Sequence, residues 1–354
     1  MFPTRRITTS GGDVFRDEFS LAFDGTNDYI DLSGTFNYNV HSISIWLKET
    51  ATSGQSTIFD HRDGNNDGIN FYLASGQPLY AVNNVDAHYT TSLDLNQWSH
   101  IVLTNDGSTS TIYVNGVSVK TADTSGETIN ISSSANARFA RDNTGNYFTG
   151  NLSEAAIYDK ALSASEVKTL YNSREPYNHK EGVCSSNLQG WWRMGDGVLD
   201  DFNLIADQTN ATKQNDLMTI DYDTQFTEKN TDSNNTVTYP TATSVRITTT
   251  DGAAVGIEDA NLLTTDSVYN CIIDITVHSG VGGRMQGNTT VHQSMATTGI
   301  YNFSFIAGDP KFNIFRRTAS ATDFTINSII IQEVNGNAGV MTNMDTDDFE
   351  GDTP

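Results

Sequence analysis

The sequence contains little cysteine, little positive charge and no long apolar run. Its only two cysteines, Cys184 and Cys271, lie far apart, so a disulfide framework does not hold the fold together, and we expect two buried free thiols. No window approaches the ~20 apolar residues that a membrane-spanning helix needs. The N-terminal segment MFPTRRITTS lacks the apolar core of a secretory signal. We therefore expect a soluble chain without membrane insertion.

The shortage of positive charge limits the partners that the protein can have. Twenty Lys and Arg stand against 43 Asp and Glu, which gives a formal net charge of −23. A surface of this charge repels DNA, RNA and anionic membranes over much of the molecule. We therefore expect no nucleic-acid partner.

The length and the hydrophobic content indicate roughly two domains. The chain has 354 residues, of which 37% are hydrophobic, enough to bury a substantial core. From residue 20 onward the patterns are short and have period two. In the segment SISIWLK, Ile43, Ile45 and Leu47 share one face and the polar and aromatic residues share the other. This alternation predicts a half-buried strand.

A turn signal and a helix signal complete the local pattern. Asn115-Gly116 lies between two β-rich runs, and these two residues supply the positive φ angles that a two-residue hairpin turn requires. The segment 163–173 is the only clear helix signal, because Ser163 and Glu166 form a capping box before an apolar stripe. One short helix among many strands predicts an antiparallel β-sandwich.

The order of these segments resembles a known family, the laminin-G-like jelly rolls related to concanavalin A. The resemblance implies an all-β protein whose first domain, residues 20–219, is a laminin-G-like antiparallel β-sandwich with its one helix near residues 163–173. The resemblance rests on SLAFDGTNDYIDL (20–32), SISIWLK (42–48), WSHIVLTNDGSTSTIYVNGVSV (98–119) and FTGNLSEAAIYDKALSASEVKTLYNS (148–173).

A second, smaller β-sandwich is expected over residues 220–334. In segments such as CIIDITVHSG and TDFTINSIIIQEV, apolar and polar residues again alternate, and residues such as Gly, Asn and Pro separate the segments. This block resembles a carbohydrate-binding module of the jelly-roll type. Residues 335–354 are rich in Gly, Asn and then acids, which predicts a solvated acidic tail or a segment ordered by a neighbour.

Two oxygen-rich stretches are candidates for a structural Ca²⁺. Asp63, Asn65 and Asp67 have the spacing that opens an EF-hand loop, but Ala74 stands where the completing acid should be. An EF-hand is therefore excluded, and a hairpin turn and a calcium loop both remain open. The family resemblance implies a second calcium set, formed by Asp24, Asn27 and Glu154, for which the alternative is a plain turn.

Carbohydrate binding is the function that a jelly roll invites. Sugars need an aromatic face and nearby amides or carboxylates, held on a rigid sheet. An equally good explanation for the aromatic residues is that they belong to ordinary strands. The candidate sugar-binding residues are His61, Arg62, Tyr72, Tyr80, Asn83, Asn84, His88 and Tyr89.

No enzyme motif occurs in the sequence. The paired carboxylates of a glycoside hydrolase are not found in one strand motif, and the nucleophile elbow, the zinc helix and the phosphate loop are all missing. We therefore expect no catalytic residues and no enzymatic activity.

Two further segments resemble parts of bacteriophage virion proteins, LQGWWRMGDG (188–197) and the final residues 335–354. The resemblance implies a virion structural protein, such as a capsid decoration, head fibre or tail component. It would be made in the host cytoplasm, displayed on the virion surface as a homotrimer, and in contact with other virion proteins and a host-surface glycan. Residues 1–19, with Arg5, Arg6 and Arg16, are the expected attachment arm. The alternatives are a free carbohydrate-binding protein and a glycan-degrading enzyme.

Overall fold

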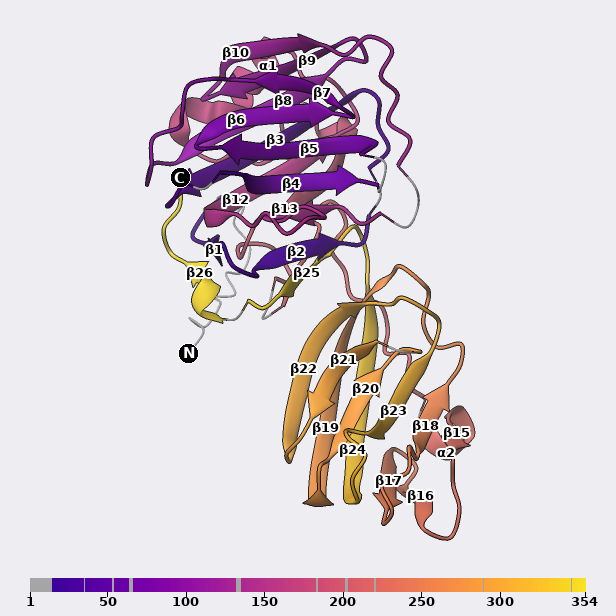
Figure 1. The fold of residues 1–354 in the computed structure, drawn as a ribbon. Coiled ribbons are helices and arrows are strands. Elements are labelled where there is room, and N and C mark those ends of the chain that lie inside the picture. Colours follow the sequence, from indigo (N-terminus) through magenta and orange to yellow (C-terminus); the bar gives the residue numbers. More distant parts are fainter. Residues whose placement is uncertain are drawn as a thin grey trace.

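The structure is a computed structural model that consists of two antiparallel β-sandwiches (Figure 1). It describes residues 15–34, 36–52, 54–63, 66–131, 135–182, 184–200, 203–219, 221–288, 290–344 and 346–354. The predicted all-β fold is confirmed. Within the described residues, no helix is both long and apolar enough to span a membrane.

One sheet of the first sandwich is built around the long central strands β3 and β12. Its strands, in sheet order, are β10 (Val117–Asp123), β9 (Thr109–Val114), β8 (Ser99–Asn105), β3 (His41–Glu49), β12 (Thr149–Tyr158), β1 (Ser20–Asp24) and β26 (Phe349–Glu350), and β13 (Leu188–Trp192) also pairs with β12.

The other sheet of the first sandwich lies in front of it in Figure 1. Its strands, in sheet order, are β14 (Leu204–Ile205), β25 (Gly339–Thr342), β2 (Tyr29–Leu32), β11 (Arg138–Phe139), β4 (Ser56–Arg62), β5 (Gly68–Ala74), β6 (Gln77–Val82) and β7 (Val85–His88). The inward-facing side chains of both sheets form one apolar core.

Aromatic side chains fill the middle of this core. Phe139 packs at 5.4 Å from Phe59 and 5.3 Å from Trp192, between ring centroids, and Phe36 packs edge-on against Trp192 at 5.9 Å. Each fully buried side chain of this size stabilises the fold by about 1.5–3 kcal/mol. Trp192, the second Trp of the WWRMGDG segment, is therefore a core residue of the first sandwich.

The helix and the hairpin turn lie where the sequence predicted them. Helix α1 (Ala164–Tyr171) begins after Ser163, whose side chain forms the capping box with Glu166. Asn115 and Gly116 have φ angles of 50° and 78° and join β9 to β10. The other short helices are α2 (Tyr222–Gln225) and three 3₁₀ turns, Asn172–Arg174, Ser185–Asn187 and Thr346–Asp348.

Strand β3 differs from the prediction of a half-buried strand, because all nine of its residues are buried. The outer side of β3 is covered by helix α1 and its neighbours. Trp46 stacks on His100 at 4.9 Å and on Tyr171, the last residue of α1, at 6.0 Å. The alternation identified the strand correctly but contained no information about the helix that covers its second face.

The expectation of two buried free thiols holds for one cysteine only. Both cysteines are free, and Cys271 is buried in the second sandwich. Cys184 is partly exposed, and its Sγ lies 2.8 Å from Glu166 Oε1 and 3.2 Å from Lys160 Nζ. Polar partners beside the first helix therefore replace the apolar surroundings that were expected.

The second sandwich has two five-stranded sheets with a separate apolar core. The first sheet, in order, is β15 (Thr227–Lys229), β18 (Gly256–Asp259), β23 (Phe312–Arg316), β20 (Gly283–Gln286) and β21 (Val291–Met295). The second is β16 (Asn235–Thr241), β17 (Ser244–Thr249), β24 (Thr322–Val334), β19 (Val268–Gly280) and β22 (Gly299–Ile306).

The second sandwich is inserted into the first. The chain leaves the first sandwich after β14 and returns to it at β25, which pairs with both β14 and β2. The two crossing segments lie side by side. Asn335 N donates to Thr212 O at 3.0 Å, and Lys213 forms an isolated antiparallel β-bridge with Val334. Figure 1 shows this insertion in orange below the indigo and magenta strands.

The expected acidic tail is therefore wrong as a solvated segment, because residues 339–342 and 349–350 are strands of the two sheets of the first sandwich. Its acids have partners. Asp352 forms an ion pair with Lys48 and accepts from Trp98 Nε1 at 3.0 Å. Glu350 accepts from Asn151 Nδ2 at 2.7 Å. Composition indicated solvation, but specific cations and amides of the first sandwich neutralise or bind these carboxylates.

Candidate functional site

The sheet that contains β2, β11, β4, β5, β6 and β7 is here called the β2–β7 sheet. The central side chains of its outer face, Asp60 and Asn70, are buried, whereas Arg62 and Tyr72 are partly exposed. The opposite sheet is covered by α1 and by residues 15–19, whereas β2, β4, β5 and β6 face the viewer in Figure 1. Charged and polar side chains form a cross-strand row there, because alternate residues of each strand point outward. In register order the row is Asp31, Arg138, Asp60, Asn70, Ala81 and Asp86.

Ion pairs fix the positions of Arg138 in this row and of Arg62 beside it. Arg138 Nε donates to Asp31 Oδ1 at 2.8 Å, and both side chains are about one quarter exposed, at 24% each. Arg62 Nε donates to Asp60 Oδ1 at 2.5 Å, and Arg62 Nη2 lies 3.7 Å from Asp142 Oδ2. Burial raises the pKa of Asp60, while the positive charge of Arg62 opposes that rise.

Several polar atoms on the same face have no hydrogen-bond partner among the described residues. They are Asp60 Oδ2, Asn70 Oδ1 and Thr57 Oγ1, all buried. Asn70 uses its amide nitrogen to donate to Asp60 Oδ1 at 2.8 Å. Buried polar groups of folded proteins are nearly always bonded, so unbonded acceptors beside the partly exposed Arg62 are a feature of binding sites as well as of strain.

Aromatic rings flank the polar row. Tyr72 is half-buried on β5. At the other end, the guanidinium of Arg141 lies 4.6 Å from the ring centroid of Tyr29 and 5.6 Å from that of Tyr147. Such cation–π contacts hold the rings in place. No sequence motif pointed to Tyr29, Arg141 or Tyr147, although the alternation in YIDL places Tyr29 and Asp31 on one face.

Two of the predicted sugar-binding residues are wrong, because they belong to the core. His61 is fully buried, packs edge-on against Phe36 at 6.0 Å, and its burial lowers the pKa to about 4. Tyr80 is fully buried and its hydroxyl bonds to His41 Nε2 at 2.5 Å. Both point inward, so a ligand on the outer face does not reach them.

Four further predicted sugar residues lie toward the β7 edge. The side chain of Asn83 is buried in the β6–β7 turn, where it accepts from Gly68 N at 2.9 Å and donates to Glu127 at 2.9 Å. Asn84 is exposed in the same turn. His88 shares the outward row of Tyr72 and bonds to Gln77 at 3.0 Å, while Tyr89 packs against the core. Arg62, Tyr72, Asn84 and His88 thus remain available at the surface.

The stretch containing Asp63 and Asp67 closes the β4–β5 hairpin. Asp63 N donates to Asp67 O at 3.0 Å, and Asp67 N donates to Asp63 Oδ1 at 3.2 Å. Asn65 lies outside the described residues. These backbone contacts are those of a turn, the first of the two interpretations left open by the sequence.

The second calcium set does not come together. Asp24 pairs with Thr149 across the sheet, whereas Glu154 lies farther along β12 at a bulge with φ 49°. Asp24 Oδ1 accepts from the backbone of Thr26 at 2.7 Å and of Asn27 at 3.2 Å, which makes a turn. The buried Glu154 is bound by protein donors instead. In the part of the chain that the structure describes, no cluster of three or more His, Cys, Asp or Glu is arranged to hold a metal.

The expected attachment arm is described only at its end. Arg5 and Arg6 lie outside the described residues. Arg16 is exposed, its Nη1 lies 3.5 Å from Glu18, and its carbonyl accepts from Arg193. Phe15 packs on Trp191 at 6.2 Å, so residues 15–19 lie against the first sandwich.

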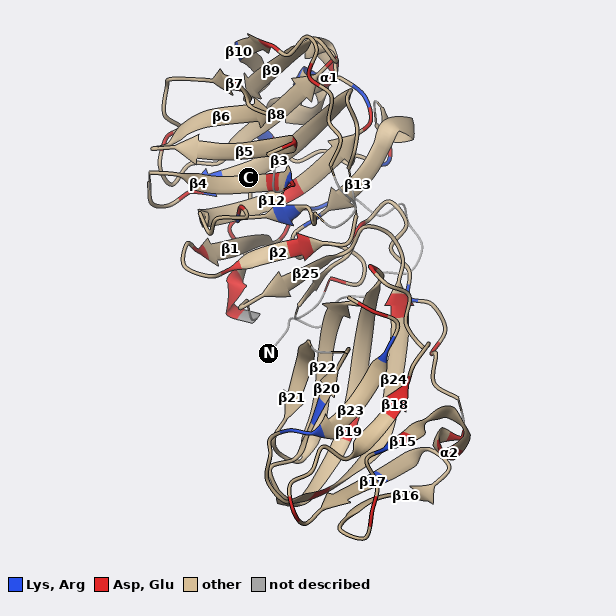
Figure 2. Ribbon diagram, turned by 45° about the vertical axis from the view of Figure 1, so that its right-hand side comes forward, with Lys and Arg blue, Asp and Glu red and all other residues tan. Residues whose placement is uncertain are grey.

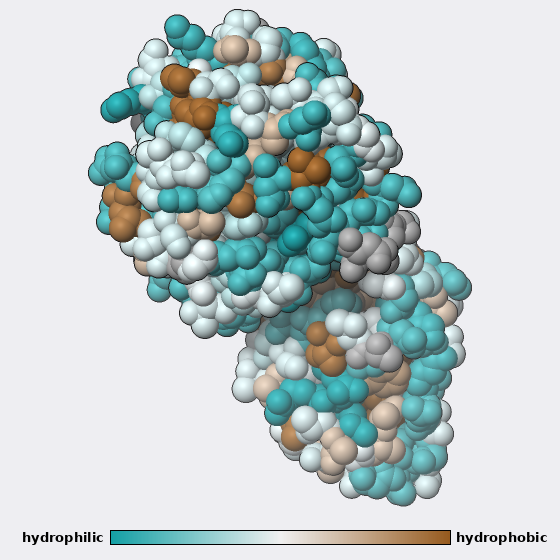
Figure 3. Space-filling view, turned by 45° about the horizontal axis from the view of Figure 1, so that its top comes forward, coloured by the Kyte–Doolittle hydropathy of each residue, from teal (hydrophilic) through white to brown (hydrophobic). Residues whose placement is uncertain are grey.

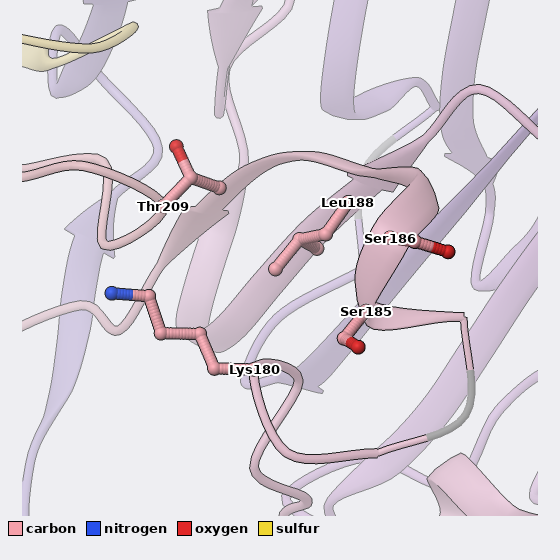
Figure 4. A pocket seen from close by; sticks show the side chains of 5 residues that line it. All are labelled: Lys180, Ser185, Ser186, Leu188 and Thr209. Carbon is pink, nitrogen blue, oxygen red and sulfur yellow. The ribbon is translucent and has the colours of Figure 1, made fainter.

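A hollow of about 310 Å³ lies beside β13, lined by Lys180, Ser185, Ser186, Leu188 and Thr209 (Figure 4). The amino group of Lys180 and the hydroxyl of Ser186 point to opposite sides in this view. Because its polar groups do not converge, the hollow is a weak candidate compared with the outer sheet face.

The surface visible in Figure 3 has no large apolar patch. Figure 3 shows a mostly hydrophilic face with small, separate apolar spots on both sandwiches. Charged residues are spread along the ribbon of both sandwiches and are not gathered in one basic stretch (Figure 2).

Comparison with known proteins gives one family match. Residues 24–168 match the model of the concanavalin A-like lectin/glucanases superfamily, which covers less than half of the chain. Comparison with curated proteins finds no match.

Among solved structures, one similar protein is from Bacteroides ovatus and is described as a candidate carbohydrate-binding protein, with a TM-score of 0.46, 18% identity, 55% of this chain covered and 56% of that chain. The chain thus spans little more than half of that protein. A heptameric SAP-like pentraxin from Limulus polyphemus has a TM-score of 0.39 and 17% identity, covering 45% of this chain and 84% of that one. The CBM40 of a Ruminococcus gnavus sialidase, solved with α2,3-sialyllactose, has a TM-score of 0.37 and 17% identity, covering 43% and 96%. The family match and the two antiparallel sheets of the first sandwich together show that residues 24–168 have a concanavalin A-like jelly-roll fold.

Proposed function

We propose that the protein binds carbohydrate on the outer face of the β2–β7 sheet and does not catalyse a reaction. The observation that carries the proposal is the partly exposed guanidinium of Arg62, which Asp60 holds in place. A sugar hydroxyl can accept a hydrogen bond from this guanidinium. Tyr72 offers an aromatic surface next to these groups.

The same geometry supports binding over hydrolysis. A glycosidase needs two carboxylates that are free to face the scissile bond. Asp60 is bonded to Arg62 and Asn70. Asp142 accepts from the backbone of Thr144 and Asn146 and so holds its own turn. Neither carboxylate is placed as an unpaired acid or base.

A glycan array followed by calorimetry tests the proposal. Wild-type protein should bind a subset of glycans, and Tyr72→Ala and Arg62→Met should each weaken binding about tenfold or more, which corresponds to about 1.4 kcal/mol. Tyr301→Ala, a half-buried tyrosine of the second sandwich, is the matched control. Binding that is unchanged in Tyr72→Ala and Arg62→Met, or reducing sugar released from an array glycan, contradicts the proposal.

We also propose that the protein is displayed on a phage particle as a homotrimer. The support is the resemblance of segments 188–197 and 335–354 to virion proteins. Both segments are part of the first sandwich, since Trp192 Nε1 donates to Asn337 O at 2.8 Å. Labelling of native particles with antibody against the second sandwich, together with light scattering on the purified chain, tests this role. A monomer that never copurifies with particles contradicts it.

A further inference from the structure

The second sandwich has a hollow on the outer face of its β15–β21 sheet. It has a volume of about 260 Å³. Its floor is formed by two cross-strand rows, because Glu258, Asn313 and Gln286 are register neighbours, as are Gly256, Phe315 and Arg284. The full lining is Asn230, Ala254, Glu258, Arg284, Gln286, Asn288, Asn313 and Phe315.

An aromatic ring forms one side of the hollow. Phe315 lies across Gly256, since a Cβ placed on Gly256 would be 2.5 Å from Phe315 Cδ1. The glycine therefore leaves room for the ring. Phe315 is half-buried, so part of its ring is open to a ligand.

The floor contains polar atoms without partners among the described residues. They are Gln286 Oε1, Asn313 Oδ1 and Arg284 Nε. Gln286 is 8% exposed and Asn313 is 2% exposed, so bulk water does not readily satisfy them. The three residues come from the adjacent strands β20 and β23, and all three line the hollow.

The neighbouring groups are held in place by the protein. Asn313 Nδ2 donates to Gly287 O at 2.9 Å, and Arg284 Nη1 donates to Arg317 O at 3.3 Å. Glu258 is paired with Lys229 at 2.7 Å and lies 3.8 Å from Lys311. The site is thus preorganised, which reduces the entropy that binding has to overcome.

We propose that this hollow is a saccharide-binding subsite, separate from the face of the first sandwich. Its volume lies just below the ~300–1,000 Å³ of pockets for drug-sized ligands, so it suits one sugar unit or the end of a glycan. A hydroxyl can donate to Gln286 or Asn313 and accept from Arg284 Nε. The apolar side of a sugar ring packs on Phe315. A metal ion suits the site less well, because Arg284 is among its lining residues and Glu258 is already paired with lysine.

Saturation-transfer NMR with a panel of methyl glycosides of hexoses, N-acetylhexosamines and uronic acids tests the subsite. The informative variant is Gln286→Leu. It removes a buried amide oxygen that has no partner among the described residues and keeps the side-chain size, so the fold should be as stable as the wild type or more stable. We expect the transfer signal of at least one glycoside to fall about tenfold in Gln286→Leu and in Phe315→Ala.

Gln332→Leu, on strand β24 of the opposite sheet, is the matched control and should leave the signal unchanged. Arg62→Met separates this subsite from the first sandwich. A signal that is lost in Arg62→Met but kept in Gln286→Leu overturns the subsite and leaves the proposed function standing. The absence of signal from every glycoside in the wild type also overturns it, whatever the glycan array shows for the first sandwich.

Discussion

The carboxylate of Glu154 is fully buried and lies 2.8 Å from Nε of Arg193. It also accepts from Trp191 Nε1 at 2.6 Å, which ties the bulge of β12 to strand β13. Asp17 and Asp196 lie beside the same guanidinium, and burial raises the pKa of Asp17 to about 7. One cation thus balances several acids where residues 15–19 meet the first sandwich.

Removal of this cation should be strongly destabilising. Arg193→Met keeps most of the packing on Phe15 and Trp191 but leaves Glu154 buried without a cation. We expect a loss of about 3–5 kcal/mol in the free energy of unfolding, measured with urea. The control Arg246→Met breaks the exposed pair with Asp323 and should cost about 1 kcal/mol or less.

A double variant checks the cause of that loss. Glu154→Gln removes the charge that Arg193→Met leaves unpaired, so the two together should be more stable than Arg193→Met alone. If the double variant loses the sum of the two single losses, the pair does not act through charge.

Glu49 should make stability depend on pH. Burial raises its pKa from 4.5 to about 7, and neither carboxylate oxygen has a partner among the described residues. The folded state therefore binds this proton more tightly than the unfolded state, so the contribution of Glu49 is most favourable below about pH 4.5 and is lost as pH rises through 7.

Glu49→Gln removes this dependence. Relative to wild type, the melting temperature of Glu49→Gln should rise progressively between pH 4.5 and pH 7 and then level off. The exposed Glu175→Gln controls for the loss of one negative charge. A constant difference between Glu49→Gln and wild type across this range contradicts the assignment.

Local signals in the sequence predicted the fold well where neighbours in the chain decide the structure. The Asn115-Gly116 turn and the Ser163 cap depend on backbone angles and hydrogen bonds within a few residues. The burial of Trp46 and the return of residues 339–350 depend on contacts with distant segments. Such contacts leave no periodic signal in a single sequence.

The candidate site, like the fold, was predictable only where residues close together in the chain decide the structure. Period-two alternation could separate Arg62 and Tyr72 from His61 and Tyr80, because adjacent residues of a strand point to opposite faces. It could not show that Arg141 stacks on Tyr29, since that contact joins segments far apart in the chain. It also could not show that Arg193 is the partner of Glu154, the residue for which a calcium role was expected.

Calcium should leave the melting temperature unchanged. Glu154 is occupied by Arg193, and the turn around Asp63 and Asp67 is closed by its own backbone hydrogen bonds. A ligand that binds only the folded state raises its stability by mass action, so melting in calcium and in chelator compares the two cases directly. A rise in calcium that Asp67→Ala abolishes would restore the calcium interpretation of that loop.

The inserted arrangement of the second sandwich gives the last prediction. Strands β25 and β26 follow the insertion in sequence but belong to the two sheets of the first sandwich. Deletion of residues 335–354 should therefore unfold or strongly destabilise the first sandwich, because β2 and β1 lose their edge partners and Trp192 loses its acceptor at Asn337. Replacement of residues 213–334 by a short Gly-Ser linker should leave the first sandwich folded, since Thr212 and Asn335 are already hydrogen-bonded neighbours. Circular dichroism and thermal melting of the two deletion proteins measure both effects. A stable first sandwich without residues 335–354 would contradict the insertion and favour two sandwiches joined end to end.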